Sequence, residues 1–125
     1  MNRILAIDDD PNVRQMICRM LERSGYDVVT AANGREGVEK FRANPPDVVI
    51  TDIIMPEQEG IETIRQLKSE FPDCRIIAIS GGGRVGPADY LNMAKLLGAA
   101  KTIRKPFDSA QLISAIREVM AEDVA

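Results

Sequence analysis

Five short runs of apolar residues recur along the chain, and a segment with apolar residues at helical spacing follows each run. A short, continuous apolar run is typical of a strand that is buried on both faces of a sheet. Strict alternation of such strands with helices favours a parallel sheet covered by helices on both sides. We therefore predict an α/β, doubly wound fold in a single domain over residues 1–125. The five predicted strands are residues 3–7, 26–31, 47–52, 75–80 and 100–104.

The predicted helices are defined by apolar stripes, with Pro11 at the start of the first helix and Gly25 at its end. Met55-Pro56 and Gly60 are predicted to form a loop before the third helix. The methionines, Met16 among them, are interpreted as core filler. The stripes comprise Val13, Met16, Ile17, Met20 and Leu21; Val38 and Phe41; Ile61, Ile64, Leu67 and Phe71; Tyr90, Leu91, Ala94 and Leu97; and Leu112, Ile113, Ile116, Val119 and Met120.

Capping residues support three of these helix starts. Asn33 stands three residues before Glu36, and Asp108 three residues before Gln111, which are the spacings of approximate capping boxes. Asp10 precedes Pro11 directly, so we interpret it as the N-cap of the first helix rather than as part of a site.

Composition excludes several functions. The sequence has no histidine, which rules out Ser-His-Asp and Cys-His catalysis and histidine-ligated zinc. The net charge of −3 provides no basic field for nucleic acid. No apolar run reaches the roughly 20 residues of a membrane span, and the start of the chain does not have the pattern of a signal peptide. We expect a cytoplasmic protein in which Cys18 and Cys74 are reduced structural thiols.

Residues capable of chemistry stand where four of the predicted strands end. Asp8 and Asp9 follow the first strand, Asp52 ends the third, Ser80 ends the fourth and Lys105 follows the fifth. The carboxyl ends of parallel strands share one edge of the sheet, so these side chains should gather there. Clustered carboxylates repel one another unless they bind a proton or a cation, and Mg²⁺ prefers carboxylate and phosphate oxygens. The pattern predicts a site that moves a phosphoryl group onto an aspartate.

Four motifs in this order resemble those of response-regulator receiver domains, the CheY-like superfamily of two-component signal transduction. The resemblance extends from about residue 3 to residue 120. It implies a flavodoxin-like (βα)5 fold with strand order 2-1-3-4-5. The motifs are Ile-Leu-Ala-Ile-Asp-Asp-Asp-Pro at 4–11, Val-Val-Ile-Thr-Asp-Ile-Ile-Met-Pro at 48–56, Ile-Ile-Ala-Ile-Ser-Gly at 76–81 and Ile-Arg-Lys-Pro-Phe at 103–107.

The resemblance also assigns roles to the residues at the predicted site. It makes Asp52 the phosphoacceptor, with Mg²⁺ held by Asp8, Asp9, Asp52 itself and the backbone carbonyl of Ile54. Lys105 would pair with a phosphoryl oxygen. In the same family pattern, the hydroxyl of Ser80 would donate a hydrogen bond to the phosphoryl group.

Partners and output are implied by the same resemblance. The donor would be a phosphohistidine on a histidine kinase or a histidine phosphotransfer protein. The output would be an unknown protein target that binds the face of helix 4, strand 5 and helix 5. We expect a stand-alone signalling phosphoacceptor rather than an enzyme with a separate substrate, acting as a monomer or weak homodimer without direct contact to nucleic acid or membrane. Relay of the phosphoryl group onward and terminal signalling both remain open.

Two positions depart from the family pattern. Thr102 occupies the position, three residues before the lysine, where many members have an aromatic residue that swings inward on activation. The segment Gly81-Gly82-Gly83 is richer in glycine than the common form of the loop that follows the hydroxyl residue.

Three other functions are compatible with parts of the pattern. An aspartate-nucleophile phosphatase of the haloacid-dehalogenase type would use Asp8 and Asp10 but would leave Asp52 without a role. A flavin-binding module of the flavodoxin type would need a phosphate-binding loop after the first strand, where the acidic residues would repel the flavin phosphate. A degenerate receiver acting as a phosphate-independent adaptor would not need the intact acidic set.

Overall fold

A computed structural model of the protein describes residues 2–53, 59–80 and 98–121. Five parallel strands form one sheet in the order β2-β1-β3-β4-β5, as predicted. The observed strands begin at the predicted residues or one residue later. They are β1 (Arg3–Ile7), β2 (Asp27–Ala31), β3 (Val48–Asp52), β4 (Ile76–Ser80) and β5 (Lys101–Arg104).

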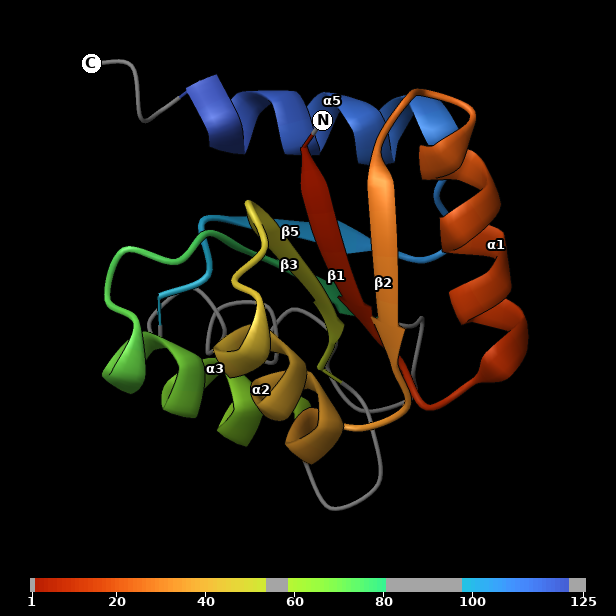
Figure 1. Ribbon diagram of the computed structural model, residues 1–125. Coiled ribbons are helices and arrows are strands. Elements are labelled where there is room, and N and C mark those ends of the chain that lie inside the picture. The colour runs from red at the N-terminus through yellow and green to blue at the C-terminus, as the bar shows by residue number, and fades with distance from the viewer. Residues whose placement is uncertain (1, 54–58, 81–97, 122–125) are drawn as a thin grey trace.

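Helices cover both faces of the sheet (Figure 1). The described residues contain α1 (Pro11–Glu22), α2 (Gly34–Ala43), α3 (Glu59–Glu70) and α5 (Ser109–Ala121). Helices α1 and α5 lie on one face, and α2 and α3 lie on the other. The helix predicted around Tyr90–Leu97 lies outside the described residues, as does the Gly81-Gly82-Gly83 segment.

The sheet separates two apolar cores because successive strand residues point to opposite faces. In β1, Leu5 and Ile7 belong to the core under α2 and α3, whereas Ile4 and Ala6 belong to the core under α1 and α5. This explains why the strands read as continuous apolar runs rather than as an alternating pattern.

The three predicted caps are confirmed. The N-cap Asp10 accepts a hydrogen bond from the backbone N–H of Asn12 at 2.8 Å. Asn33 Oδ1 accepts from Glu36 N at 2.8 Å. The third cap is reciprocal, because Asp108 Oδ1 accepts from Gln111 N at 2.8 Å while Gln111 Oε1 accepts from Asp108 N at 2.9 Å. These bonds satisfy N–H groups that a helix start otherwise leaves without partners.

Two predictions about individual residues were wrong. Gly60 lies inside α3 rather than in a loop, because α3 begins immediately beside the end of β3. Met16 is 37% exposed and is not core filler, because Ile17 and Leu21 supply the buried side of α1.

Pro106, which follows β5, is preceded by a cis peptide bond. Within the described ranges, none of the helices has the length and apolar character needed to cross a membrane.

Candidate functional site

Strand register brings the acidic residues to one edge of the sheet. Ile7 lies beside Thr51 in the β1–β3 ladder, so the next residues, Asp8 and Asp52, reach the same end of neighbouring strands. On its other side, β1 continues to pair with β2 beyond Ile7, because the backbone N–H of Asp8 donates a hydrogen bond to Ala31 O at 3.1 Å. Both carboxylate residues are buried, with Asp8 2% and Asp52 5% exposed.

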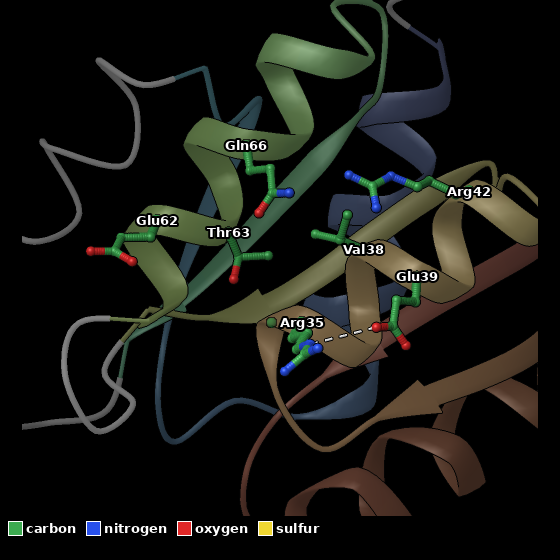
Figure 2. Close-up of a pocket in the computed structure, with 8 residues that line it drawn as sticks. Arg35, Val38, Glu39, Arg42, Glu62, Thr63 and Gln66 are labelled. Carbon is green, nitrogen blue, oxygen red and sulfur yellow. Dashed lines mark ion pairs between the residues drawn. The ribbon is translucent and has the colours of Figure 1, made fainter.

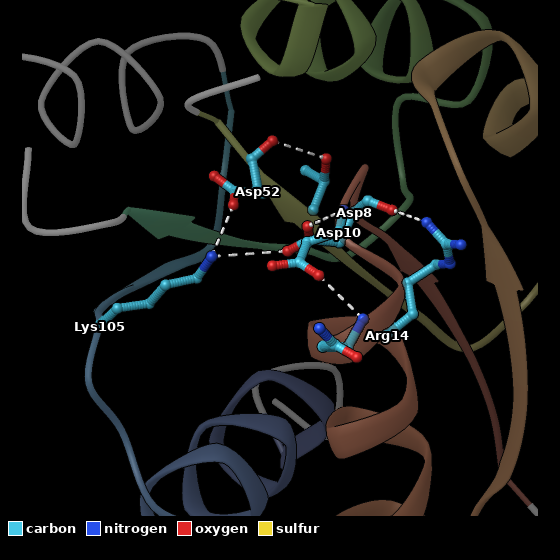
Figure 3. A network of polar contacts seen from close by, with 7 residues as sticks. Asp8, Asp10, Arg14, Asp52 and Lys105 are labelled. Atoms are coloured by element: carbon cyan, nitrogen blue, oxygen red, sulfur yellow. Dashed lines mark hydrogen bonds and ion pairs between the residues drawn. The ribbon is translucent and has the colours of Figure 1, made fainter. Parts of the chain in front are cut away.

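Lys105 reaches this edge from the end of β5 (Figure 3). Its Nζ donates a hydrogen bond to Asp52 Oδ2 at 2.8 Å and lies 3.6 Å from Asp8 Oδ2. One ammonium group therefore faces both buried carboxylates. The sequence prediction that these three side chains converge at the carboxyl ends of the strands agrees with this geometry.

Burial shapes the electrostatics of the cluster. Desolvation raises the pKa of Asp8 to about 6, and the nearby charge of Asp52 acts in the same direction. The backbone N–H of Asp10 and the Lys105 ammonium act against this rise. For Lys105, burial acts to lower the pKa, but the hydrogen bond and charge of Asp52 together with the charge of Asp8 outweigh it and raise the pKa overall.

The buried oxygen Asp8 Oδ2 has no hydrogen-bond partner within the described residues. The other carboxylate oxygen, Oδ1, accepts a hydrogen bond from Asp10 N at 2.9 Å. A buried carboxylate oxygen without a hydrogen bond is costly, and a hard cation would satisfy it. The donor chemistry at this edge therefore fits Mg²⁺, which commonly takes one or two protein carboxylates and completes its shell with water and phosphate oxygens.

The other predicted site residues are Asp9, Ser80 and Ile54. Asp9 is exposed next to Asp8. Ser80 ends β4 beside Arg104, which places its backbone next to the strand that leads to Lys105. Ile54 lies outside the described residues. Among the residues that the structure describes, no group of three or more acidic, cysteine or histidine side chains is arranged to hold a metal. The full ligand set thus remains a prediction.

The first turn of α3 lies closer to the end of β3 than the sequence indicated. A Cβ atom built on Gly60 would lie 2.2 Å from the backbone oxygen of Asp52 and 2.5 Å from Ile53 Cα. Only a residue without a side chain lets the first turn of α3 pack this closely against the end of β3. Glycine inside a helical pattern was the available signal, because it is unfavourable there without a packing reason.

Gly60→Ala is accordingly expected to destabilise the fold by about 1–3 kcal/mol, although alanine favours helices. The clashing atoms belong to the backbone that carries Asp52, so they cannot move aside like a flexible side chain. Urea unfolding followed by circular dichroism would measure the change. Ser69→Ala, at an exposed position of the same helix, is the control and should unfold close to wild type. A Gly60→Ala protein as stable as wild type would contradict this packing.

A separate polar groove of about 430 Å³ lies between α2 and α3 (Figure 2). Arg35 and Glu39 form an ion pair across one turn of α2 at 3.6 Å, and Glu62 and Thr63 line the groove from α3. Its charges are of both signs, so the described lining favours neither an anion nor a cation. The groove is distinct from the cluster of Asp8, Asp52 and Lys105.

The fold and the position of the cluster define a class: a flavodoxin-like α/β protein whose acidic site lies beyond the strand ends. A family model of the response regulator receiver domain matches residues 4–117, and the chain belongs to that family. The chemotaxis protein CheY of Thermotoga maritima is 36% identical over 118 residues, covering 94% of this chain and 96% of that protein. Protein PilH of Pseudomonas aeruginosa is 36% identical over 121 residues, covering 97% and 99%.

A solved structure agrees with this assignment. The receiver domain protein of Clostridium thermocellum has a TM-score of 0.90 and 34% identity, covering 98% of this chain and 97% of that one. Family membership decides against the dehalogenase-type and flavodoxin-type hypotheses. The chain is a receiver domain of two-component signalling, and receivers of this family act as signalling phosphoacceptors.

Proposed function

We propose that this chain accepts a phosphoryl group on Asp52, with Mg²⁺, and thereby switches a protein-binding surface. The observation that carries the proposal is the cluster in which Lys105 Nζ lies 2.8 Å from Asp52 Oδ2 and 3.6 Å from Asp8 Oδ2. Within the described residues, Asp8 Oδ2 has this ion pair but no hydrogen bond. The cluster combines a nucleophilic carboxylate, a cation for a phosphoryl oxygen and a carboxylate oxygen left for a metal.

In the proposed reaction, a carboxylate oxygen of Asp52 attacks phosphorus in line with the bond to the donor's imidazole nitrogen. A phosphorus–oxygen bond forms, the phosphorus–nitrogen bond breaks and the imidazole leaves with its electron pair. Lys105 exchanges its contact with Asp52 for one with a phosphoryl oxygen and stabilises the charge there. The hydroxyl of Ser80 donates a hydrogen bond to another phosphoryl oxygen.

Asp8, Asp9, Asp52 and the carbonyl of Ile54 would hold Mg²⁺ in this proposal. When bound, the ion offsets the repulsion between these carboxylates and the incoming phosphoryl group. The chain acts on itself only, so it is a signalling phosphoacceptor that assists its own phosphoryl uptake and loss, without a separate turnover substrate.

The proposed donor is a histidine kinase or a histidine phosphotransfer protein. The proposed target is a protein that binds a face formed by β5, α5 and the helix predicted from the sequence around Tyr90–Leu97. Single-domain relatives covered over 96–99% of their length support a receiver that works as one domain over residues 1–125. We also propose that it acts as a monomer or weak homodimer. Cys18 and Cys74 are free and half-buried, which supports action in a reducing compartment such as the cytoplasm.

Transfer from a phosphohistidine donor tests this function. A purified histidine phosphotransfer domain carrying radiolabelled phosphate would be mixed with the protein and Mg²⁺, and label on each protein would be followed by gel. Label is expected to move to wild type and to Asp73→Asn, a control at an exposed acidic position, but not to Asp52→Asn. Transfer to Asp52→Asn at the wild-type rate would show that another residue is the acceptor.

A further inference from the structure

Several hydrogen bonds hold the acidic turn of Asp8, Asp9 and Asp10 after β1, and one of them comes from a side chain of α1. The Asp8 backbone N–H bonds to Ala31 O, and its Oδ1 accepts from Asp10 N. The carbonyl oxygen of Asp8 accepts a hydrogen bond from Arg14 Nη1 at 2.6 Å. Figure 3 shows the Arg14 side chain reaching from α1 to this carbonyl.

The hydrogen bond from Arg14 holds the peptide unit that connects the two acidic residues. The Asp8 carbonyl belongs to the peptide unit that joins Asp8 to Asp9, so its orientation sets the direction in which Asp9 leaves the strand. Asp9 is exposed, so packing does little to orient its side chain. A half-buried arginine that donates a short, charge-assisted hydrogen bond to this carbonyl can hold the peptide in one orientation.

We propose that Arg14 is a positioning residue for the metal-binding acidic turn. It does not touch the metal or the phosphoryl group but fixes the Asp8–Asp9 peptide, so that both carboxylates are presented together. This inference rests on the proposed function, because it concerns the Mg²⁺ affinity of the same site. Partners that orient metal ligands commonly contribute tenfold or more to metal affinity.

Isothermal titration with Mg²⁺ alone tests the proposal without phosphoryl transfer. Arg14→Gln removes the charge and the reach of the guanidinium while keeping a residue that favours helices. It is expected to bind Mg²⁺ roughly tenfold more weakly than wild type. Arg14→Lys keeps a cationic donor that can bond the carbonyl, so its affinity should lie between the two. Arg19→Gln removes an exposed arginine from the same helix and should bind like wild type.

Thermal unfolding without metal would accompany the titrations, which are run where every variant is folded. Equal Mg²⁺ affinity of Arg14→Gln and wild type would overturn the inference. So would an equal loss in Arg14→Gln and Arg19→Gln, because a loss shared with the exposed control could not come from the contact between Arg14 and the Asp8 carbonyl. A wild-type protein that does not bind Mg²⁺ would instead overturn the proposed function, and this inference with it.

Discussion

Asp8→Asn is expected to raise the free energy of unfolding of the metal-free protein at pH 7 by about 2–3 kcal/mol. Burial raises the pKa of Asp8 from 3.8 to about 6, so its ionised form is disfavoured in the folded state. Asparagine has no charge to bury, and its side-chain oxygen can still accept the hydrogen bond from Asp10 N. Urea unfolding by circular dichroism, with chelator present, would measure the gain.

The sign of the effect follows from the raised pKa. Between pH 3.8 and about 6 the folded protein holds the Asp8 proton more tightly than the unfolded chain does. The stability due to this group is therefore greatest below pH 4 and decreases as the pH rises through about 6. The advantage of Asp8→Asn should be absent near pH 4 and complete at pH 7. An advantage that does not change with pH would contradict the electrostatic explanation.

Mg²⁺ should reverse the order of stability, so that wild type becomes more stable than Asp8→Asn. A ligand that binds only the folded state stabilises it by an amount that grows with the logarithm of the ligand concentration relative to Kd, and Asp8→Asn removes a proposed Mg²⁺ ligand and so raises that Kd. Saturating Mg²⁺ is thus expected to raise the unfolding midpoint of wild type much more than that of Asp8→Asn. Asp73→Asn, in the exposed turn after α3, is the matched control and should respond to Mg²⁺ as wild type does.

Lys105→Met is expected to slow phosphoryl uptake by a factor on the order of 10², as loss of a preorganised charge at a reacting oxygen typically does. It should also lower the metal-free stability by about 1–2 kcal/mol, because Asp8 and Asp52 would lose the ammonium group that both of them face. This expected loss of stability is smaller than that for breaking a fully buried ion pair, because the Lys105 side chain is 26% exposed. Stopped-flow or quenched-flow labelling would give the rate.

Lys101→Met provides the control for that experiment. Lys101 begins β5, the strand that leads to Lys105, but it pairs with Glu118 on the surface, so its loss should cost less than 1 kcal/mol and leave the uptake rate unchanged. Similar rates for Lys105→Met and wild type would contradict the role given to Lys105.

Local patterns predicted the framework well because strand burial and helix capping leave short-range signals. The apolar runs located every strand to within one residue at its start, and the spacings of Asn33 with Glu36 and of Asp108 with Gln111 located two helix starts. The meeting of Asp8, Asp52 and Lys105 was also predictable, because parallel topology sends all carboxyl ends of strands to one edge.

Features that depend on close contact between distant segments were not predictable in the same way. The position of Gly60 inside α3 follows from its distance to the backbone of Asp52, which no local pattern encodes. The bond from Arg14 to the Asp8 carbonyl depends on how a long side chain folds back over the start of α1. Met16 fits the apolar stripe of α1, yet it faces outward because Ile17 already occupies the buried position.

Intact mass after incubation with acetyl phosphate tests the central claim most directly. Wild type, Asp52→Asn and Asp73→Asn would each be measured with Mg²⁺ and with chelator. The account predicts a gain of one phosphoryl group in wild type and in Asp73→Asn, only with Mg²⁺, and no gain in Asp52→Asn. An equal gain in Asp52→Asn, or a gain that persists with chelator, would contradict a metal-dependent acceptor at Asp52.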